Sequence, residues 1–438
     1  MPALQSSAVG LATQLPEALA AQPSAQVERS PSAVRGRGHR PRDTAHLSVQ
    51  RLSRHADVAA LESEWRELYE LAAGRNPYAS PDWVIAWLEH LVHENELAVL
   101  TVRRDGRLIG VAPCYLRSVA RVLGASAART VQLAGTIRFP GLTELPQALA
   151  ARGETRSVLR AVVGHWIAAP ERWDWLELPL DAEQGWFEPQ WLGEGEAFTG
   201  LVQHKTTRAA VVLPLDGAAA SVRTALKRNV WESVKRARNR LDKSGRVWRV
   251  VVHRAPDEVA AALPVLRRLH GARASIAGRR VHPDVLGDPA RYAFVADAAG
   301  RMAANDRVEL LTLDVDGTAI AALLVLRAPR AAFLALSGVD PHWWHVGPVT
   351  LLQYAAIERA AERGDAEVNL SVGPDISKLR WSDRVVQHPE FVVCGPRPGS
   401  RRRLAAYAAA GAVAAVRREA GRHQVRRTGT EADAHDRD

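Results

Sequence analysis

The sequence predicts an α/β protein, with an α+β mixed sheet built from two tandem copies of one unit and helices packed on both faces. Three observations predict it. The same order of helices, hairpin and strand–helix–strand occurs twice, and each hairpin has an Asp-Gly turn, at Asp105-Gly106 and Asp316-Gly317. Asp-Gly between two apolar runs is the strongest short-range hairpin signal. The two turns lie one domain length apart, which indicates a duplicated domain and not a short solenoid repeat.

The composition is that of a globular protein and argues against several other classes. The chain has 438 residues, 47% of them hydrophobic and 24% charged, which favours two domains with tails. Its two cysteines, Cys114 and Cys394, lie far apart, which argues against a zinc site or a disulfide scaffold. No apolar run reaches the roughly 18–20 residues of a membrane-spanning helix, and the N-terminus does not have the pattern of a secretory signal. We therefore expect a cytoplasmic protein with no metal.

The first copy begins with two predicted helices. The apolar residues of Asp57–Ala73 recur at helical spacing, and Ser80 followed by Pro81 suits the start of a second helix. The hairpin around Asp105 comes next. It is followed by a strand over 130–135, a helix near 155–167 and a strand over 173–178.

The second copy repeats this order. Helices are predicted over Asp257–Ala274 and near Asp288–Ala304, before the hairpin around Asp316. A strand over 332–338, a helix over 348–363 and a strand over 367–372 follow. A hairpin followed by strand–helix–strand gives a mixed sheet with helices on its faces.

These patterns divide the chain into four parts. We expect a disordered tail over residues 1–46, an N-terminal domain over 47–216, a C-terminal domain over 217–398, and a basic helix with a disordered tail over 399–438. Between the copies, Ser221–Lys243 is predicted to form one long helix with an apolar face and a basic face. The basic face is either solvated or contacts an anionic partner.

The chemistry is expected in the second copy, at two segments that follow strands. In the first, Gly347 and Pro348 lead into the helix that continues with Val349, and such a helix start is a ready site for a phosphate or carboxylate. The alternative is an ordinary cap. Asp340, Trp343, Trp344 and His345 precede it, with the two tryptophans either lining a substrate slot or packing.

In the second segment, a strand ends in Gly373-Pro374-Asp375 and leads to Lys378. The carboxyl edge of such a sheet usually binds ligands. Only five of the 58 basic residues are lysines, namely Lys205, Lys227, Lys235, Lys243 and Lys378, so a lysine retained here is informative. Its compact ammonium suits a phosphate or a developing oxyanion. Arg380 adds a second cation to this segment, and Trp381 forms either an apolar wall or part of the core.

Several of these residues together resemble a known family. The order Trp65, Asn76–Trp83, the basic helix, Leu269-His270, Val346-Gly347-Pro348 and Gly373–Trp381 resembles the GNAT-like acetyltransferases of the CelD-like and BioF2-like group, relatives of the FemAB-type aminoacyl transferases. The resemblance spans roughly residues 48–398. It implies two tandem GNAT-type domains, the first of them degenerate, and transfer of an acyl group from a thioester or ester carrier, usually to an amine.

The resemblance also implies roles for single residues. A lysine at the place of Lys378 steadies the carbonyl oxygen under attack. Gly347, Pro348, Val349 and Gly373 would hold the donor, expected to be acetyl-CoA or another acyl-CoA, and His270, Trp343, Trp344, His345, Arg380 and Trp381 would line the acceptor site. Asp340, Asp375 and His345 are candidate bases. The usual GNAT pyrophosphate loop is absent, and Ile376 stands where the family has an aromatic residue.

The acceptor is expected to be an amine of a sugar, a polysaccharide or cell-envelope precursor, or a small metabolite. Two alternatives stay open. One is a FemAB-like transferase whose donor is a charged tRNA, with the basic helix on the phosphate backbone. The other is a non-catalytic binding protein on the same fold, with weak peripheral membrane contact through Arg401–Arg427.

Overall fold

The structure is a computed structural model that describes residues 47–72, 74–120, 126–136, 142–181, 202–215, 222–276, 282–411 and 413. The predicted N-terminal tail and residues 414–438 lie outside these ranges. Residues 400–411, the described part of the predicted C-terminal basic segment, are helical.

Two sheets carry the described strands, one of four strands in the order β1-β2-β3-β6 and one of ten in the order β4-β5-β7-β14-β8-β13-β12-β11-β10-β9. Their bounds are β1 Leu47–Leu52, β2 Val99–Arg104, β3 Arg107–Ala112, β4 Cys114–Val119, β5 Ala128–Leu133, β6 Leu149–Ala150, β7 Trp175–Pro179, β8 Val202–Pro214, β9 Trp248–His253, β10 Val308–Val315, β11 Thr318–Ala328, β12 Ala331–Val339, β13 Glu367–Val372 and β14 Val385–Cys394.

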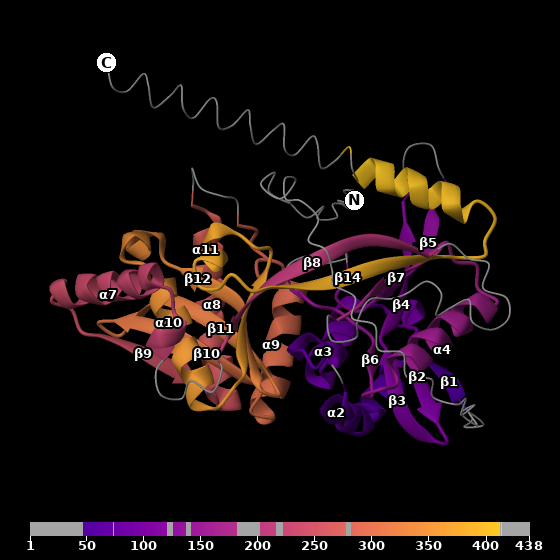
Figure 1. The fold of residues 1–438 in the computed structure, drawn as a ribbon, viewed down its shortest axis with the longest axis horizontal. Coiled ribbons are helices and arrows are strands. Elements are labelled where there is room, and N and C mark those ends of the chain that lie inside the picture. Colours follow the sequence, from indigo (N-terminus) through magenta and orange to yellow (C-terminus); the bar gives the residue numbers. More distant parts are fainter. Residues whose placement is uncertain are drawn as a thin grey trace, which may run out of the picture.

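Helices cover both faces of this strand framework (Figure 1). The α-helices are α1 His55–Ala60, α2 Glu62–Leu71, α3 Pro81–Leu91, α4 Thr155–Ala168, α6 Val222–Ala225, α7 Arg228–Lys243, α8 Pro256–Ala274, α9 Pro289–Ala304, α10 Pro348–Glu362 and α11 Ile376–Leu379. Three short 3₁₀ turns complete them: η2 Pro77–Ala79, η3 Glu94–Glu96 and η5 Pro341–Val346.

The strand pairing confirms the predicted duplication. In the first half, β2 pairs antiparallel with β3, and β5 pairs parallel with β7. In the second half, β10 pairs antiparallel with β11, and β12 pairs parallel with β13. Both hairpins use left-handed turn residues, with φ of 49° at Asp105 and at Asp316. Asp and Gly are the residues that tolerate this conformation, so the same sequence signal forms the same turn twice.

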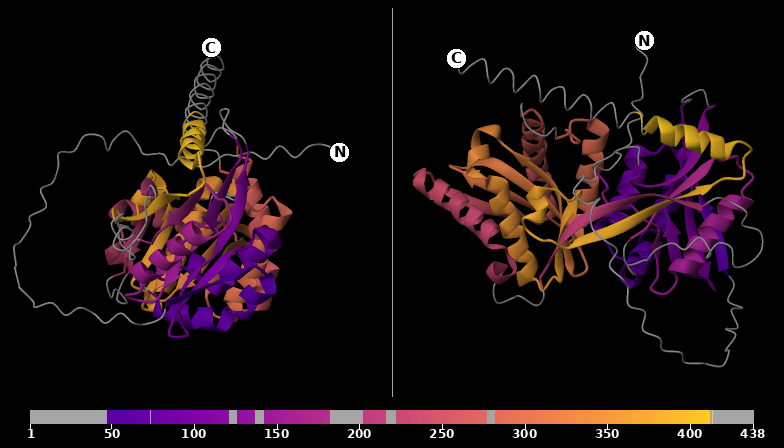
Figure 2. Two further views of the ribbon diagram at one scale, coloured as in Figure 1. Left: turned by 90° about the vertical axis from the view of Figure 1, so that its right-hand side faces the viewer. Right: turned by 45° about the horizontal axis from the view of Figure 1, so that its top comes forward.

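The two halves exchange their last strands. β8, from the first half, pairs antiparallel with β13 of the second, and β14, from the second half, pairs antiparallel with β7 of the first. β8 and β14 also pair with each other at the centre of the ten-stranded sheet. Figures 1 and 2 show these two long strands running side by side across the molecule. The boundary predicted at residues 216–217 follows β8, and it stays a prediction.

One hydrophobic core is shared by both halves. Its buried residues come from α2 and α3 of the first half and from α8 and α9 of the second. Trp83 of α3 meets Phe294 of α9 edge to face, with ring centroids 4.9 Å apart. A second core lies under α7 and α10, and a third lies under α4. The halves therefore share both a sheet and a core.

The prediction of one helix over Ser221–Lys243 is wrong. The chain forms α6 and then α7, with an extended break at Lys227, whose ψ is 144°. The Lys227 ammonium donates to the carbonyl oxygen of Leu379 at 2.8 Å and to the Asp383 carboxylate at 2.5 Å. These two contacts hold the Lys227 side chain against residues 379 and 383, and the helix is interrupted at Lys227. The helix predicted over Asp57–Ala73 likewise divides at Leu61 into α1 and α2.

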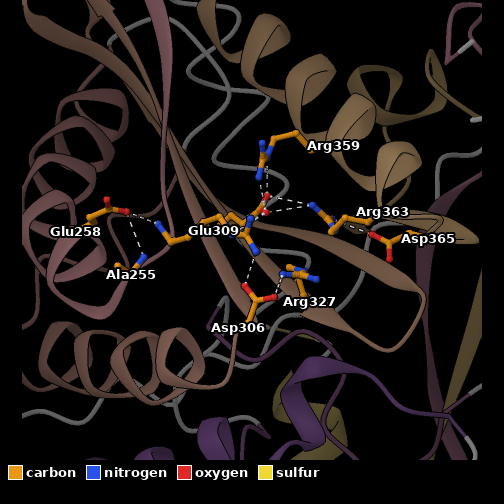
Figure 3. A network of polar contacts seen from close by, with 9 residues as sticks. Ala255, Glu258, Asp306, Glu309, Arg327, Arg359, Arg363 and Asp365 are labelled. Atoms are coloured by element: carbon orange, nitrogen blue, oxygen red, sulfur yellow. Dashed lines mark hydrogen bonds and ion pairs between the residues drawn. The ribbon is translucent and has the colours of Figure 1, made fainter.

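A buried ion network anchors α10 to the sheet (Figure 3). Glu309 of β10, 1% exposed at its side chain, accepts bidentate hydrogen bonds from Arg359 at 2.9 and 3.0 Å. Arg363, one turn further along α10, donates to the same carboxylate at 3.1 and 3.2 Å. This network fixes how α10 lies on the sheet, and so it fixes where the first turn of α10 lies.

Candidate functional site

The candidate site lies where two neighbouring parallel strands end. β12 and β13 are paired only through residues 331–333 and 367–369. After this short ladder, β12 leads through Asp340 and η5 into α10, and β13 leads through Gly373 into α11. The carboxyl ends of neighbouring parallel strands are where α/β sheets usually bind ligands, and both predicted segments begin there.

The N-terminus of α10 forms one side of this site. Gly347 is its N-cap, in the left-handed conformation with φ of 82°, and no side chain caps the helix. Pro348 occupies the first turn and has no N–H to satisfy. The positive end of a 15-residue helix therefore faces the site without a side-chain acceptor.

Arg380 joins the two segments. Its Nη2 donates to the hydroxyl of Thr350, in the first turn of α10, at 2.9 Å. Its Nε is buried and has no hydrogen-bond partner among the described residues. Burial lowers the pKa of this guanidinium. A partly desolvated cation beside a helix N-terminus favours an anion there.

Lys378 lies at the end of β13, with three acceptors around its ammonium. Nζ donates to the carbonyl oxygen of Val372, to that of Gly373 at 3.1 Å, and to the Ser371 hydroxyl at 3.4 Å. Ser371 itself has φ of 82°, a left-handed conformation that is unusual for serine. Strained residues of this kind cluster at functional sites.

A carboxylate from the first half reaches this point. Ser371 Oγ donates to Glu144 Oε1, and the backbone N–H of Val372 donates to Glu144 Oε2 at 3.4 Å. Burial raises the pKa of Glu144, and its hydrogen bond with Ser371 and the charge of Lys378 oppose that rise without cancelling it. Burial and the Glu144 charge together raise the pKa of Tyr78 well above its usual value.

His270 and Arg273, both on α8, form the third side. His270 Nδ1 donates to the Ser337 carbonyl oxygen at 2.9 Å, and Nε2 accepts from Val285 N at 3.3 Å. Burial lowers the pKa of His270, so the ring is neutral and both of its nitrogens are occupied. Arg273 donates to the Ser337 hydroxyl at 2.6 Å, and burial lowers its pKa while Asp375 acts against that shift. Gly338 allows α8 to pack closely on β12, because a Cβ at residue 338 would lie 2.4 Å from the backbone nitrogen of His270.

The other predicted site residues divide into two groups. Asp375 is the N-cap of α11 and accepts from Ser377 N at 2.9 Å, so it lies within the Lys378 segment. Asp340 caps η5 by accepting from His342 N at 2.9 Å. η5 contacts α7 and the segment between α7 and β9. Arg246 of that segment lies over the Trp343 ring at 5.6 Å, and Arg240 of α7 donates to the His345 carbonyl oxygen. Trp343 and Trp344 are partly buried against the α7–α10 core.

Trp381 belongs to the core beneath the site. Its side chain is only 1% exposed and packs among the residues under α7 and α10. Arg380 covers its ring at 5.5 Å. Of the two roles that the sequence leaves open for Trp381, the structure places it in the packed core.

The sequence does not single out four residues that the structure brings here, namely Tyr78, Glu144, Arg273 and Ser371. Glu144 alone carried a signal, because it is a lone acid in the apolar run Leu142-Thr-Glu-Leu-Pro146. Tyr78 lies in the Asn76–Trp83 segment, where Ser80 caps α3 as expected by accepting from Trp83 N at 3.3 Å.

Within the described ranges, no group of three or more His, Cys, Asp or Glu residues is arranged to hold a metal ion. In the same part of the chain, no helix combines the length and apolar character needed to cross a membrane.

Comparison with known proteins supports this description. Residues 228–379 match the acetyltransferase (GNAT) domain family. The crystal structure of FemX superposes with a TM-score of 0.50 at 11% identity, covering 76% of this chain and 95% of that one. A conserved protein of unknown function from Bacteroides thetaiotaomicron reaches 0.49 at 10% identity, covering 79% and 99%. The DUF2156 domain of a putative lysylphosphatidylglycerol synthetase from Agrobacterium fabrum reaches 0.45 at 10%, covering 81% and 96%.

At such identities these likenesses concern the fold alone, and only the FemX superposition is close enough to support it. No match was found among curated protein sequences. The matched family segment runs from the start of α7 to the end of α11 and so includes Gly347, Gly373 and Lys378. The chain therefore carries a GNAT-type acyltransferase domain over residues 228–379, within a fold shared with FemX.

Proposed function

We propose that this protein is an N-acyltransferase that moves an acetyl or longer acyl group from acyl-CoA to an amine of a sugar, a polysaccharide or cell-envelope precursor, or a small metabolite. The single observation that carries the proposal is the convergence of Lys378, the N-terminus of α10 and Arg380 at the ends of β12 and β13. The matched GNAT domain gives the reaction class.

The residues present fit a phosphate-bearing donor. The uncapped first turn of α10 with Gly347, Pro348 and Val349 would face a phosphate, and Arg380 would supply a charge-assisted hydrogen bond through its unpartnered Nε. Arg273 adds a second partly buried guanidinium near the same edge.

The chemistry needs little more. The lone pair of the acceptor amine attacks the thioester carbonyl, the C–S bond breaks, and the departing thiolate takes up the proton that the amine loses. Negative charge grows on the carbonyl oxygen in the transition state. Lys378 would stabilise that charge through the positive charge of its ammonium, which the carbonyl oxygens of Val372 and Gly373 and the Ser371 hydroxyl hold in place. Asp375, oriented by Ser377 N and Lys378 N, is the nearest of the candidate bases to Lys378 along the chain.

One observation favours a second donor, an aminoacyl-tRNA. The α7 side chains Arg228, Arg236, Arg240 and Lys243 are exposed and hydrogen-bonded to no carboxylate among the described residues. Such a face suits a phosphate backbone, with binding that weakens steeply as salt rises.

The test is acyl transfer from acetyl-CoA and longer acyl-CoAs, followed by thiol release against a panel of amines and amino sugars. Lys378→Ala should reduce kcat by about a hundredfold or more, the usual factor for losing one oxyanion donor. Lys235→Ala is the matched control, because this exposed lysine of α7 pairs with Glu232 at 2.7 Å. Absence of both CoA binding and thiol release would overturn the acyl-CoA proposal, and transfer from charged tRNA would then establish the second donor.

A further inference from the structure

Glu144 is the one acidic side chain of the first half that is hydrogen-bonded to the Lys378 segment in the described part of the chain. The buried residues Thr143 and Leu145 flank it. Thr143 is fixed in turn, because its hydroxyl accepts from the indole N–H of Trp83 at 2.9 Å. Glu144 is therefore held on a packed segment and not on a free loop.

The donor and the acceptor can be assigned in both hydrogen bonds of the Ser371 hydroxyl. The ionised Glu144 carboxylate can only accept, so the Ser371 hydroxyl donates its single hydrogen to Glu144. The Lys378 ammonium can only donate, so it uses a lone pair of the same hydroxyl oxygen. Ser371 thus bridges an anion and a cation, and the charge of Glu144 favours the orientation in which the hydroxyl donates to Glu144 and accepts from Lys378.

The left-handed backbone at Ser371 is held by the same contacts. The Ser371 N–H donates to the buried Asn369 side chain at 2.8 Å, and the next N–H, of Val372, donates to Glu144. The carbonyl oxygens of Val372 and Gly373, which follow directly, receive the Lys378 ammonium. Glu144 therefore acts on both the hydroxyl and the backbone that surround Lys378.

We propose that Glu144 is a positioning residue which the N-terminal half supplies to the acyl-transfer site, where it acts through Ser371 to hold the ammonium of Lys378 in place. The inference rests on the proposed role of Lys378 in transfer. It gives the N-terminal half a part in the reaction beyond structural support.

The charged and titratable groups that face Glu144 come from four elements. They are Tyr78 of η2, Ser371 of β13 and Lys378 of α11, together with Arg208 of β8, whose Nη1 donates to the Glu144 carbonyl oxygen at 3.0 Å. Burial raises the pKa of Glu144. Protonation, which removes the charge that orients Ser371, therefore begins at a higher pH than for an ordinary glutamate, and transfer should fall as the pH falls through that raised pKa.

The first test does not depend on activity. Because the chain has five lysines, lysine labelled with ¹³C at Cε should give few signals, and the Lys378→Arg variant identifies the one from Lys378. In the wild type, this signal should shift with a midpoint above the usual glutamate range. The shift should vanish in Glu144→Gln, weaken in Ser371→Ala, and persist in the control Glu67→Gln, which changes an exposed carboxylate of α2.

The second test is kinetic. Glu144→Gln, close in size to the native side chain, should lower kcat by about ten- to a hundredfold, the factor for one hydrogen bond to a charged group, and leave the KM for acyl-CoA unchanged. It should also lose the acid limb of the pH profile. Glu144→Asp should restore part of kcat.

The outcomes separate this inference from the proposed function. If the Lys378 signal titrates identically in wild type and Glu144→Gln, the inference is overturned, even where transfer depends on Lys378. An unchanged pH profile in Glu144→Gln overturns it as well. If the titration is lost in Glu144→Gln but no donor is used by the wild type, the proposed function fails while the contact between the halves stands.

Discussion

At the scale of single residues, the arginines of the C-terminal half differ by partner. Arg359 and Arg363 bind the buried Glu309 carboxylate. Arg380 and Arg273 are hydrogen-bonded to hydroxyls instead, those of Thr350 and Ser337, and burial lowers the pKa of each. A guanidinium that has lost water without gaining a carboxylate hydrogen bond favours an anionic ligand.

Arg380→Ala should therefore weaken donor binding more than it affects turnover. Hydrogen bonds to charged groups contribute about 1.5–3 kcal/mol, which corresponds to roughly a ten- to hundredfold rise in the dissociation constant of CoA. Calorimetric titration of CoA measures this, with Arg152→Ala as the control, since Arg152 is exposed in the first half. An unchanged dissociation constant would place the donor phosphates elsewhere.

Apart from His270, the sequence predicted only parts of the site that lie in one stretch of the chain, residues 340–381. Gly347-Pro348 follows β12 after the short turn η5, and Gly373–Trp381 follows β13 directly, so their placement near the strand ends could be predicted from local pattern. Glu144 reaches Ser371 only through packing of the two halves. No periodicity encodes a contact between residues 144 and 371, and so it could not be predicted.

At the scale of elements, α10 depends on Glu309. Burial opposes ionisation of this carboxyl, but the hydrogen bond with Arg359 and the charges of Arg363 and Arg359 prevail and lower its pKa. A lowered folded-state pKa stabilises the native protein above the ordinary glutamate range, and this contribution is lost as the pH falls through the folded-state value.

Glu309→Gln should destabilise the protein by about 3–5 kcal/mol at neutral pH, since it removes the carboxylate that pairs with Arg359 and leaves Arg363 with Asp365 alone. The difference from the wild type should shrink as the pH is lowered, because the wild-type carboxyl then protonates as well. Urea unfolding at several pH values measures it, beside Glu362→Gln, an exposed residue of the same helix. A difference that stays constant with pH would mean that charge is not what Glu309 contributes.

Hydrogen bonds to Asp174 attach the helix at residues 400–411 to the first half. This fully buried carboxylate accepts from Arg403 Nε at 2.6 Å, Ser400 Oγ at 2.9 Å and Arg397 Nη1 at 3.1 Å. Tyr407 then packs on Trp175, with ring centroids 5.4 Å apart. In Figure 1 this helix lies along the first half, next to β5 and β7.

Asp174→Asn should release this helix locally. Amide hydrogen exchange over 400–411 should accelerate by about ten- to a hundredfold, as expected when hydrogen bonds to a charged group are lost. Exchange in α10 should not change. Asp57→Asn, an exposed residue of α1, serves as the control. Equal acceleration throughout the chain would show that Asp174 supports global stability and not this one attachment.

At the scale of the whole molecule, the strand exchange escaped prediction for a physical reason. β8 and β14 carry charged residues that interrupt the apolar pattern of a strand. Lys205 of β8 pairs with Glu177 of β7 at 3.0 Å and with Glu390 of β14 at 2.8 Å. Burial opposes the Lys205 charge, but the two carboxylates raise its pKa above the usual value. These ion pairs link β7, β8 and β14. The same charges that make β8 and β14 hard to predict as strands therefore hold the exchanged strands together.

A chain cut between residues 216 and 217 tests this organisation. The fragment 47–216 retains β7 without β14, and the fragment 217–411 retains β13 without β8, so each exposes an unpaired sheet edge and half of the shared core. Neither fragment should unfold cooperatively alone, whereas the two mixed should recover a cooperative transition and the Lys378-dependent transfer. Lys205→Ala, which removes the salt-bridge partner of Glu177 and one of the two partners of Glu390, should weaken the mixed complex by about 3–5 kcal/mol. Cooperative unfolding of either fragment alone would show two independent domains, and the contact between Glu144 and Ser371 would then have to form by docking. Recovery only on mixing would mean that the halves fold as one unit, with the site completed by strand exchange itself.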